Sequence, residues 1–226
     1  MISRPAMLNE RRESRASSVI MYLLLAFILL VLVFDLVRAY CLIVVEVKGS
    51  SMRDTLYGGE LVGNDYEGGD IVYAVRGNAA ERGEIVIIDT SGSDAYDPSG
   101  EAVFTAQIII KRLIAVEGDC VKCENGIVYL KKQGGEYLAL NEPYAKGRTP
   151  DFPEVCVGEG QIFFLGDNRM NSADSEDIVR SGYSLLNKES IVGVVHDWAV
   201  SVKGVTTWLE NVRASIYGTK VTEDLP

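Results

Sequence analysis

The sequence has little histidine and little positive charge. His196 is the single histidine among 226 residues, which leaves few ways to build a metal site or a histidine-centred acid–base pair. Only 22 Lys and Arg stand against 32 Asp and Glu, for a formal net charge of −10. This balance argues against nucleic acid as a partner, because phosphate binding needs a concentrated cationic face. The apolar fraction of 47% excludes global disorder and is sufficient for a core in a chain of this length.

One long apolar run lies near the N-terminus. Residues 19–34 read VIMYLLLAFILLVLVF, without a charge, and with their flanks they are long enough to cross a bilayer as a helix. Residues 1–17 hold four arginines against two glutamates, for a net charge of +2, so the remaining residues carry −12. We therefore predict a cytoplasmic basic segment over 1–17, a transmembrane anchor over 18–37, and a C-terminal part outside the cell.

A cleaved signal peptide is the competing interpretation of this run. The arginines and the apolar stretch would fit one, but a cleavage site requires small residues after the stretch. The sequence there is Asp35-Leu-Val-Arg-Ala-Tyr-Cys41, which is bulky and charged. We therefore favour an uncleaved anchor.

Strand signals dominate from Cys41 onward. Short runs rich in Val, Ile and Tyr are separated by clusters of Gly, Asn, Asp and Pro, and Asn125-Gly126 predicts a hairpin turn. The predicted strands are Leu42–Val47, Ile71–Val75, Ile85–Ile88, Val103–Val116, Ile127–Leu130, Gln161–Leu165 and Ile191–Val195. This pattern predicts a mainly β fold, an antiparallel sheet or barrel, as an extracytoplasmic domain over residues 38–205.

The remaining segments are predicted to lie outside this sheet. Residues 89–102 and 131–153 are rich in turn formers and charges and are interpreted as solvated excursions. Residues 206–226 are predicted to form a short amphipathic helix, over 206–217, followed by a frayed tail.

Three of the four cysteines fall in the predicted exported part. Cys120 and Cys123 have the spacing of half a zinc or redox site, but no second pair follows. We therefore expect no metal and one disulfide among Cys120, Cys123 and Cys156, with an odd thiol left over. The sequence leaves the pairing open.

Three stretches contain candidate catalytic residues. Ser50-Ser51 follows the first predicted strand, where serines usually belong to turns. Lys111-Arg112 interrupts an aliphatic strand, so the two side chains point to opposite faces and one of them meets apolar surroundings. A desolvated lysine loses its preference for the charged form and can accept a proton, whereas an edge-strand lysine would extend to water. Residues 166–175, GDNRMNSADS, form a tight polar loop.

In this order, the stretches resemble the motifs of bacterial type I signal peptidases. The serine motif of that family, G/S-x-S-M-x-P-T-L, is matched by residues 49–56. Its lysine motif, (Y/V)-(I/V)-K-R-(L/V)-I-(A/G)-x-x-G-D, is matched by residues 109–119. Its last motif, G-D-N-R-x-x-S-x-D-S, is matched position by position over residues 166–175. A single anchor is similar to the Gram-positive form of the family.

The resemblance implies a role for individual residues. It implies that Ser51 is the nucleophile and Lys111 the general base of a Ser/Lys dyad without a cofactor. Ser172 corresponds to the serine that orients the lysine amine, and Asp174 to the structural aspartate of the family. Met52 corresponds to a residue that walls the site. The backbone N–H of Ser51 would be an oxyanion-hole donor.

The sequence departs from the family pattern at three positions. Gly49 replaces a side-chain oxyanion donor that some members have, as in many Gram-positive relatives. Asp54 stands where a proline is expected, which removes a constraint on φ. Glu176 replaces the arginine that usually pairs with the aspartate, so Asp174 would need another cation, for which Arg169 and Arg180 are candidates.

The resemblance implies a membrane-bound serine endopeptidase that removes signal peptides from exported preproteins. Its partners would be those preproteins and the lipid bilayer. Two alternatives remain: a Ser/His/Asp hydrolase built on His196, and a specialised or inactive membrane-tethered β domain that acts in binding or assembly. The oligomeric state and the range of substrates are left open.

Overall fold

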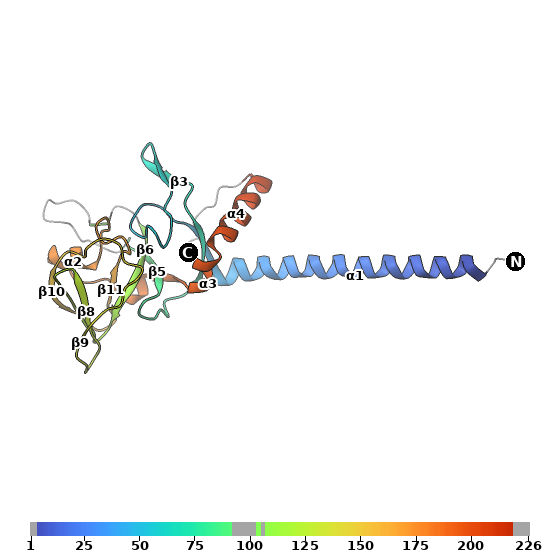
Figure 1. Cartoon of the computed structure of the whole chain (residues 1–226). Helices are drawn as coiled ribbons and strands as arrows, with labels where there is room; N and C mark the ends of the chain where they lie inside the picture. Colours follow the sequence, from blue (N-terminus) through green and yellow to red (C-terminus); the bar gives the residue numbers. More distant parts are fainter. Residues whose placement is uncertain (1–3, 92–102, 105–106, 219–226) are drawn as a thin grey trace. The chain divides into compact units, whose positions relative to one another are not determined.

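The computed structural model describes residues 4–91, 103–104 and 107–218, with the backbone alone for residues 4–16 (Figure 1). Most of the predicted excursion at 89–102 and the predicted tail after residue 218 lie outside these residues. The chain divides into two units, Met1–Leu42 and Ile43–Pro226.

The first unit is a single helix, α1 (Arg4–Cys41). Its segment Ser17–Cys41 is 25 residues long, and an 18-residue stretch within it has a mean hydropathy of 2.9 and no buried residue. At 1.5 Å per residue such a segment exceeds the ~30 Å hydrocarbon thickness of a bilayer. The helix is therefore long and apolar enough to be the single membrane anchor that the sequence predicts.

The described residues of the second unit form three sheets. The six-stranded sheet has the order β1-β4-β12-β5-β6-β11, a four-stranded sheet has the order β10-β7-β8-β9, and β2-β3 is a separate hairpin. The strands of the large sheet are β1 (Leu42–Glu46), β4 (Ile71–Arg76), β5 (Ile85–Asp89), β6 (Ile108–Val116), β11 (Ile162–Leu165) and β12 (Ile191–Val195). The other strands are β2 (Glu60–Val62), β3 (Asp65–Glu67), β7 (Cys120–Glu124), β8 (Ile127–Lys131), β9 (Tyr137–Ala139) and β10 (Phe152–Cys156).

Both faces of the large sheet are covered, which explains its continuous aliphatic runs. In β5 the side chains of Ile85 and Ile87 enter one core cluster, with Met52 and Leu56. Those of Val86 and Ile88 enter a second cluster, because successive side chains of a strand point to opposite faces. Each buried aliphatic side chain contributes about 1.5–3 kcal/mol relative to exposure. β6 lies between β5 and β11, so it is an interior strand.

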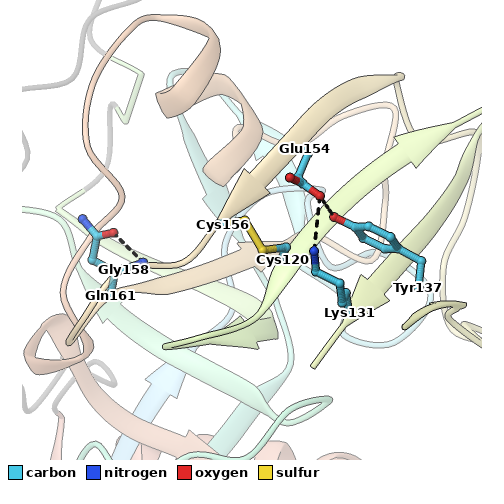
Figure 2. The surroundings of a disulfide bond; sticks show 7 residues. All are labelled: Cys120, Lys131, Tyr137, Glu154, Cys156, Gly158 and Gln161. Carbon is cyan, nitrogen blue, oxygen red and sulfur yellow. Dashed lines mark hydrogen bonds and ion pairs between the residues drawn. A yellow bond between two sulfur atoms is a disulfide. The ribbon is translucent and has the colours of Figure 1, made fainter. Parts of the chain in front are cut away.

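A disulfide joins two strands of the four-stranded sheet. Cys120 of β7 is bonded to Cys156 of β10, while Cys123 is a buried free thiol (Figure 2). The prediction of one bridge with an odd thiol is thus confirmed. Burial raises the pKa of the Cys123 thiol to about 11, so it stays protonated at neutral pH. Beside the bridge, Glu154 accepts a hydrogen bond from Tyr137 and forms an ion pair with Lys131.

Short helices complete the second unit: α2 (Ser175–Arg180), the 3₁₀ helix η1 (Lys188–Ser190), α3 (Asp197–Ser201) and α4 (Lys203–Tyr217). Residues 206–217 are helical, as predicted, and the helix begins three residues earlier. It ends before Gly218, whose φ of 66° is the left-handed conformation that glycine adopts readily.

The predicted fold class is confirmed: the sheets are mostly antiparallel and the N-terminal apolar helix precedes them. Asn125 and Gly126, both with positive φ, form the turn between β7 and β8, as predicted. The interpretation of residues 131–153 as a solvated excursion is confirmed in part: most of them are exposed, but the segment is not a plain loop. They contain β9 and the start of β10, and Thr149 among them is buried.

Candidate active site

Ser51 lies in a turn between β1 and β2. Met52 and Leu56 fix this turn, because both side chains are fully buried in the core. The backbone N–H of Leu56 donates to the Met52 carbonyl at 2.8 Å, and the N–H of Arg53 donates to the Ser50 carbonyl at 3.0 Å. Ser51 itself is only half-buried, so its hydroxyl is held on a rigid turn at the surface.

Lys111 points from the middle of β6 into a buried cluster. Its side chain is 4% exposed, and Nζ lies 3.3 Å from Oδ1 of Asp174. Nζ also donates a hydrogen bond of 2.5 Å to Ser172 Oγ, which in turn donates one of 2.5 Å to Asp174 Oδ1. The backbone N–H of Gly166 donates to both carboxylate oxygens of Asp174. The lysine is therefore not an edge-strand side chain in water, and that alternative is wrong.

The loop after β11 brings Ser51 and Ser172 together. The backbone N–H of Asn168 donates to the Ser51 carbonyl at 2.9 Å, and its side-chain amide donates to the Ser50 carbonyl at 3.0 Å. A Cβ atom on Gly166 would lie 2.2 Å from Ser172 Oγ and 2.7 Å from the Ser51 carbonyl oxygen. The two serines thus approach the same small glycine, and a larger residue there would push them apart.

Arg112 lies on the opposite face of β6 from Lys111. In the ladder with β5, Lys111 pairs with Val86 and Arg112 with Ile85, and these two residues belong to different core clusters. The prediction that the two cations point to opposite faces is confirmed. Both are buried, however, so the polar group of each has to be met by polar partners inside the protein.

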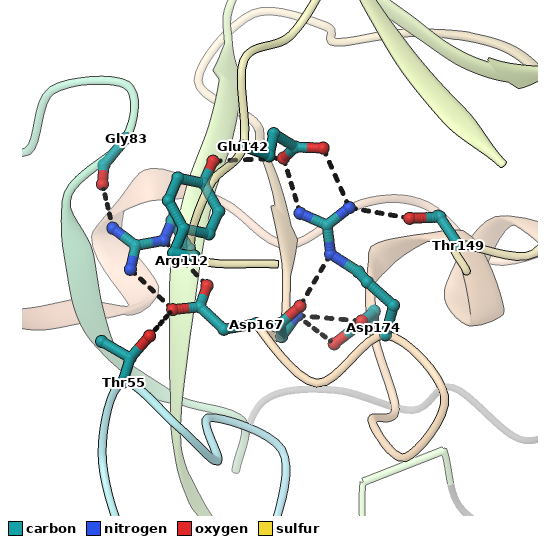
Figure 3. A network of polar contacts seen from close by, with 10 residues as sticks. Thr55, Gly83, Arg112, Glu142, Thr149, Asp167 and Asp174 are labelled. Atoms are coloured by element: carbon teal, nitrogen blue, oxygen red, sulfur yellow. Dashed lines mark hydrogen bonds and ion pairs between the residues drawn. The ribbon is translucent and has the colours of Figure 1, made fainter. Parts of the chain in front are cut away.

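A dense network surrounds the Arg112 guanidinium (Figure 3). It donates to both oxygens of Asp167 at 2.8 and 2.6 Å and to the Gly83 carbonyl at 2.6 Å. Asp167 also accepts a 2.6 Å hydrogen bond from Thr55 of the Ser51 turn. The Tyr144 ring covers the guanidinium at 3.8 Å. This network fastens the turn that carries Ser51 to β6.

A second arginine holds the loop after β11 from the other side. Arg169 donates to both oxygens of Glu142, to the Thr149 hydroxyl and to the Gly166 carbonyl. Sequence reasoning missed Glu142 and Thr149, because both lie in the segment that was interpreted as a solvated excursion. Their polar character gave no signal that they close a buried network.

Comparison with known proteins decides the family. Residues 19–198 match the family described as "Signal peptidase, peptidase S26". Signal peptidase I of Bacillus amyloliquefaciens is 34% identical over 174 residues, covering 74% of this chain and 79% of that protein. Signal peptidase I P of Bacillus subtilis subsp. natto is 32% identical over 192 residues, covering 82% and 91%.

This chain belongs to the type I signal peptidase family. A solved signal peptidase I from Enterococcus faecalis also matches, with a TM-score of 0.36 and 24% identity over 52% of this chain and 97% of that one. The assignment itself rests on the sequence matches.

The backbone conformation explains two of the positions at which this sequence departs from the signal peptidase motif. Asp54 has a φ of 82°, a value that proline cannot adopt, and its carboxylate lies 3.5 Å from Lys146. Gly49 has a φ of 83°, and its carbonyl lies so close to Gly58 that a Cβ atom there would overlap it. The turn therefore follows a path that the usual proline would not permit.

Of the two arginines proposed for Asp174, Arg180 is placed elsewhere, whereas Arg169 interacts with the Asp174 charge although its ion pair is with another carboxylate. Arg169 pairs with Glu142 and Arg180 with Glu176. Lys111 comes within 3.3 Å of Asp174 and is its ion-pair partner among the described residues. Burial raises the pKa of Glu176 to about 7, although the Arg180 guanidinium opposes this.

The contacts of His196 are with residues outside the Ser51 turn. Its Nδ1 is 2.8 Å from the Glu84 carboxylate, and both line a surface hollow with Arg82, Gly83, Asp197 and Trp198. None of these lining residues belongs to the three signal peptidase motifs. The geometry therefore gives no support to a hydrolase built on His196.

One cluster in the described part of the chain has the residue types of a metal site. Cys120, Cys156 and Glu154 could each offer a ligand atom. The two cysteines are joined to each other, and a disulfide sulfur is not the thiolate that binds metals. The cluster is thus better described as a covalent tether.

Proposed function

We propose that this protein is a membrane-anchored signal peptidase that cleaves signal peptides from exported preproteins through an acyl-enzyme on Ser51. The observation that carries the proposal is the buried Lys111 amine, hydrogen-bonded to Ser172 in the loop that also holds the backbone of Ser51. The family to which the chain belongs supports the same activity.

In this mechanism Ser51 Oγ attacks the scissile carbonyl while its proton passes to the uncharged amine of Lys111. A serine hydroxyl needs such a base because it is a weak nucleophile. Ser172 and Asp174 hold the amine in position, and the backbone N–H of Ser51 stabilises the oxyanion. A donor of that kind typically contributes about 3–4 kcal/mol. The protonated amine then protonates the leaving peptide nitrogen, and the same amine activates the water that hydrolyses the ester.

The anchor determines which substrates reach the site. We propose that the arginine-rich N-terminal segment stays in the cytoplasm and that the β domain faces outward, following the positive-inside rule. A translocated preprotein leaves its signal peptide in the same bilayer, so its cleavage site lies near the membrane surface. Cys41, exposed at the end of α1, tests this orientation: a membrane-impermeant maleimide should label it in intact cells from outside.

Adjacent serines provide the sharpest test of the nucleophile. Full-length protein in proteoliposomes is offered a preprotein with an Ala-x-Ala site, and cleavage is followed by gel. Ser51→Ala should abolish cleavage, whereas Ser50→Ala, which loses only a hydrogen bond from Asn171, should stay within about tenfold of wild type. Cleavage that survives in Ser51→Ala contradicts the mechanism. No cleavage by the wild type would favour the alternative of an inactive binding domain.

A further inference from the structure

The helix α4 packs onto the sheet with its polar side. Thr206 and Glu210 are buried, and the Thr206 hydroxyl donates to the Ile71 carbonyl at 2.5 Å. The Ile71 N–H donates to the Thr207 hydroxyl at 2.8 Å, and the Tyr73 hydroxyl donates to Glu210 at 2.6 Å. Ile71 and Tyr73 belong to β4, so the helix is fixed to this strand mainly by hydrogen bonds.

The opposite side of α4 is apolar and exposed. Five large side chains repeat there at helical spacing, which places them along one face. This apolar stripe consists of Val205 (58% exposed), Trp208 (62%), Leu209 (41%), Val212 (39%) and Ile216 (71%). A surface helix ordinarily turns its apolar face to the core and its polar face to water. The reversed arrangement leaves a row of large apolar side chains exposed, which is unfavourable in water.

Chain connectivity indicates which surface is available to cover it. The apolar helix α1 ends at Cys41, and β1 begins at the next residue, Leu42. β1 is the neighbour of β4 in the sheet, and β4 carries α4. Neighbouring strands are only ~4.8 Å apart, so the strand that bears α4 lies beside β1, and β1 follows the apolar helix in the chain with no intervening linker.

The composition of α4 fits a lipid–water interface. Tryptophan is enriched at this depth because its ring is apolar and its N–H is polar. Trp208 lies in the middle of the stripe, and Arg213 is a positive side chain at its edge, whereas Lys203 lies on the packed side, where its amine contacts Asp70 and the Thr55 carbonyl. A helix of 15 residues is ~22 Å long, too short to span a bilayer but suitable for lying in its surface plane.

We propose that α4 lies in the interface of the bilayer that α1 crosses, with the apolar stripe among the acyl chains, as a second membrane contact. The protein would then be held at two points, by a spanning helix and by a surface helix. The proposal concerns membrane contact alone and does not depend on peptidase activity.

The tryptophans allow the full chain to be tested directly. Trp198 and Trp208 are its two tryptophans, so Trp198→Phe leaves Trp208 as the sole reporter. This variant is placed in nanodiscs of phosphatidylglycerol and phosphatidylethanolamine, with one chain per disc. Brominated acyl chains should reduce the Trp208 fluorescence about twofold or more, and acrylamide should quench it less than in a urea-unfolded sample.

Charge placed on the stripe should remove this protection. In the same background, Val205→Glu with Ile216→Glu should abolish quenching by brominated lipid. Asn211→Glu, which adds a charge at an exposed position of α4 off the stripe, should leave it unchanged. All three replaced residues are exposed, so the far-ultraviolet circular dichroism should be unaltered.

Two results would overturn the proposal. One is equal Trp208 fluorescence in brominated and ordinary discs together with full access to acrylamide. The other is protection that appears in crowded liposomes but not in single-chain discs, because a second copy of the chain would then cover the stripe.

Discussion

Neighbouring basic side chains on the two faces of β6 differ in the number of polar partners that surround them. The Arg112 guanidinium has a bidentate carboxylate, a backbone carbonyl and a stacked tyrosine ring. The Lys111 amine has one hydroxyl at hydrogen-bond distance and a carboxylate at 3.3 Å. Arginine keeps its charge in proteins, whereas lysine can lose its proton. The fully satisfied cation is thus suited to a fixed brace, and the less satisfied one to proton transfer.

Replacing the lysine by the side chain of its neighbour, arginine, should reduce cleavage more than the other changes described below. In Lys111→Arg the guanidinium is permanently charged and cannot accept a proton, so cleavage should fall at least ~10³-fold. The measurement is kcat/KM on a preprotein in detergent, with the melting temperature as a control for folding. Substantial activity in this variant would show that the amine is not the base.

Ser172→Ala tests how the amine is held. The replacement removes the acceptor of the Lys111 hydrogen bond and the donor to Asp174, so the amine loses its orientation. We expect kcat to fall ~10²-fold with KM little changed, since small misplacements of a catalytic group have effects of this size. A change confined to KM would place Ser172 in substrate binding instead.

Replacing Arg112, on the other face of β6, should lower the stability of the protein more than its catalytic activity. Arg112→Lys keeps the charge near Asp167 but loses the bidentate fork and the stacking on Tyr144, which should reduce the free energy of unfolding by about 1–3 kcal/mol. Thermal unfolding of the full chain in detergent measures this. If the loss in activity approaches that of Lys111→Arg while stability is kept, the division of roles between the faces is wrong.

Replacing Glu176 should have the smallest effect, a change in stability that depends on pH. Its folded pKa of about 7 lies above the ordinary value of 4.5, so the folded state binds this proton more tightly than the unfolded state. The resulting stabilisation is complete below about pH 4.5 and is lost as the pH rises through 7. Glu176→Gln should remove that dependence, with a gain on the order of 1 kcal/mol at pH 8. Melting temperatures measured across this range test it; equal slopes for both proteins would contradict it.

Much of the fold followed from local patterns. The aliphatic runs of β4, β5 and β12, the hairpin at Asn125-Gly126 and the apolar N-terminal helix each have a signal that depends on near neighbours in the sequence. The short strands β2, β3 and β9 have no such signal, because each is only three residues long and depends on its partner strand.

The candidate site shows the same limit. Lys111 could be singled out because a cation inside an aliphatic strand is unusual. The partners of Arg169 could not, since Glu142 and Thr149 are ordinary polar residues until the chain folds. Nor could the ion-pair partner of Asp174 be found by looking for an arginine along the sequence, because Lys111 reaches it from a strand more than sixty positions away.

The left-handed conformation of Asp54 has a consequence for engineering. Replacing a residue by the one most common among relatives usually stabilises a protein. At this position that practice would introduce a proline whose ring fixes φ near −65°, where the backbone has +82°. The replacement would force the turn into another path, and the neighbouring serine would move with it. We therefore expect Asp54→Pro to destabilise the protein, although it would restore the family motif.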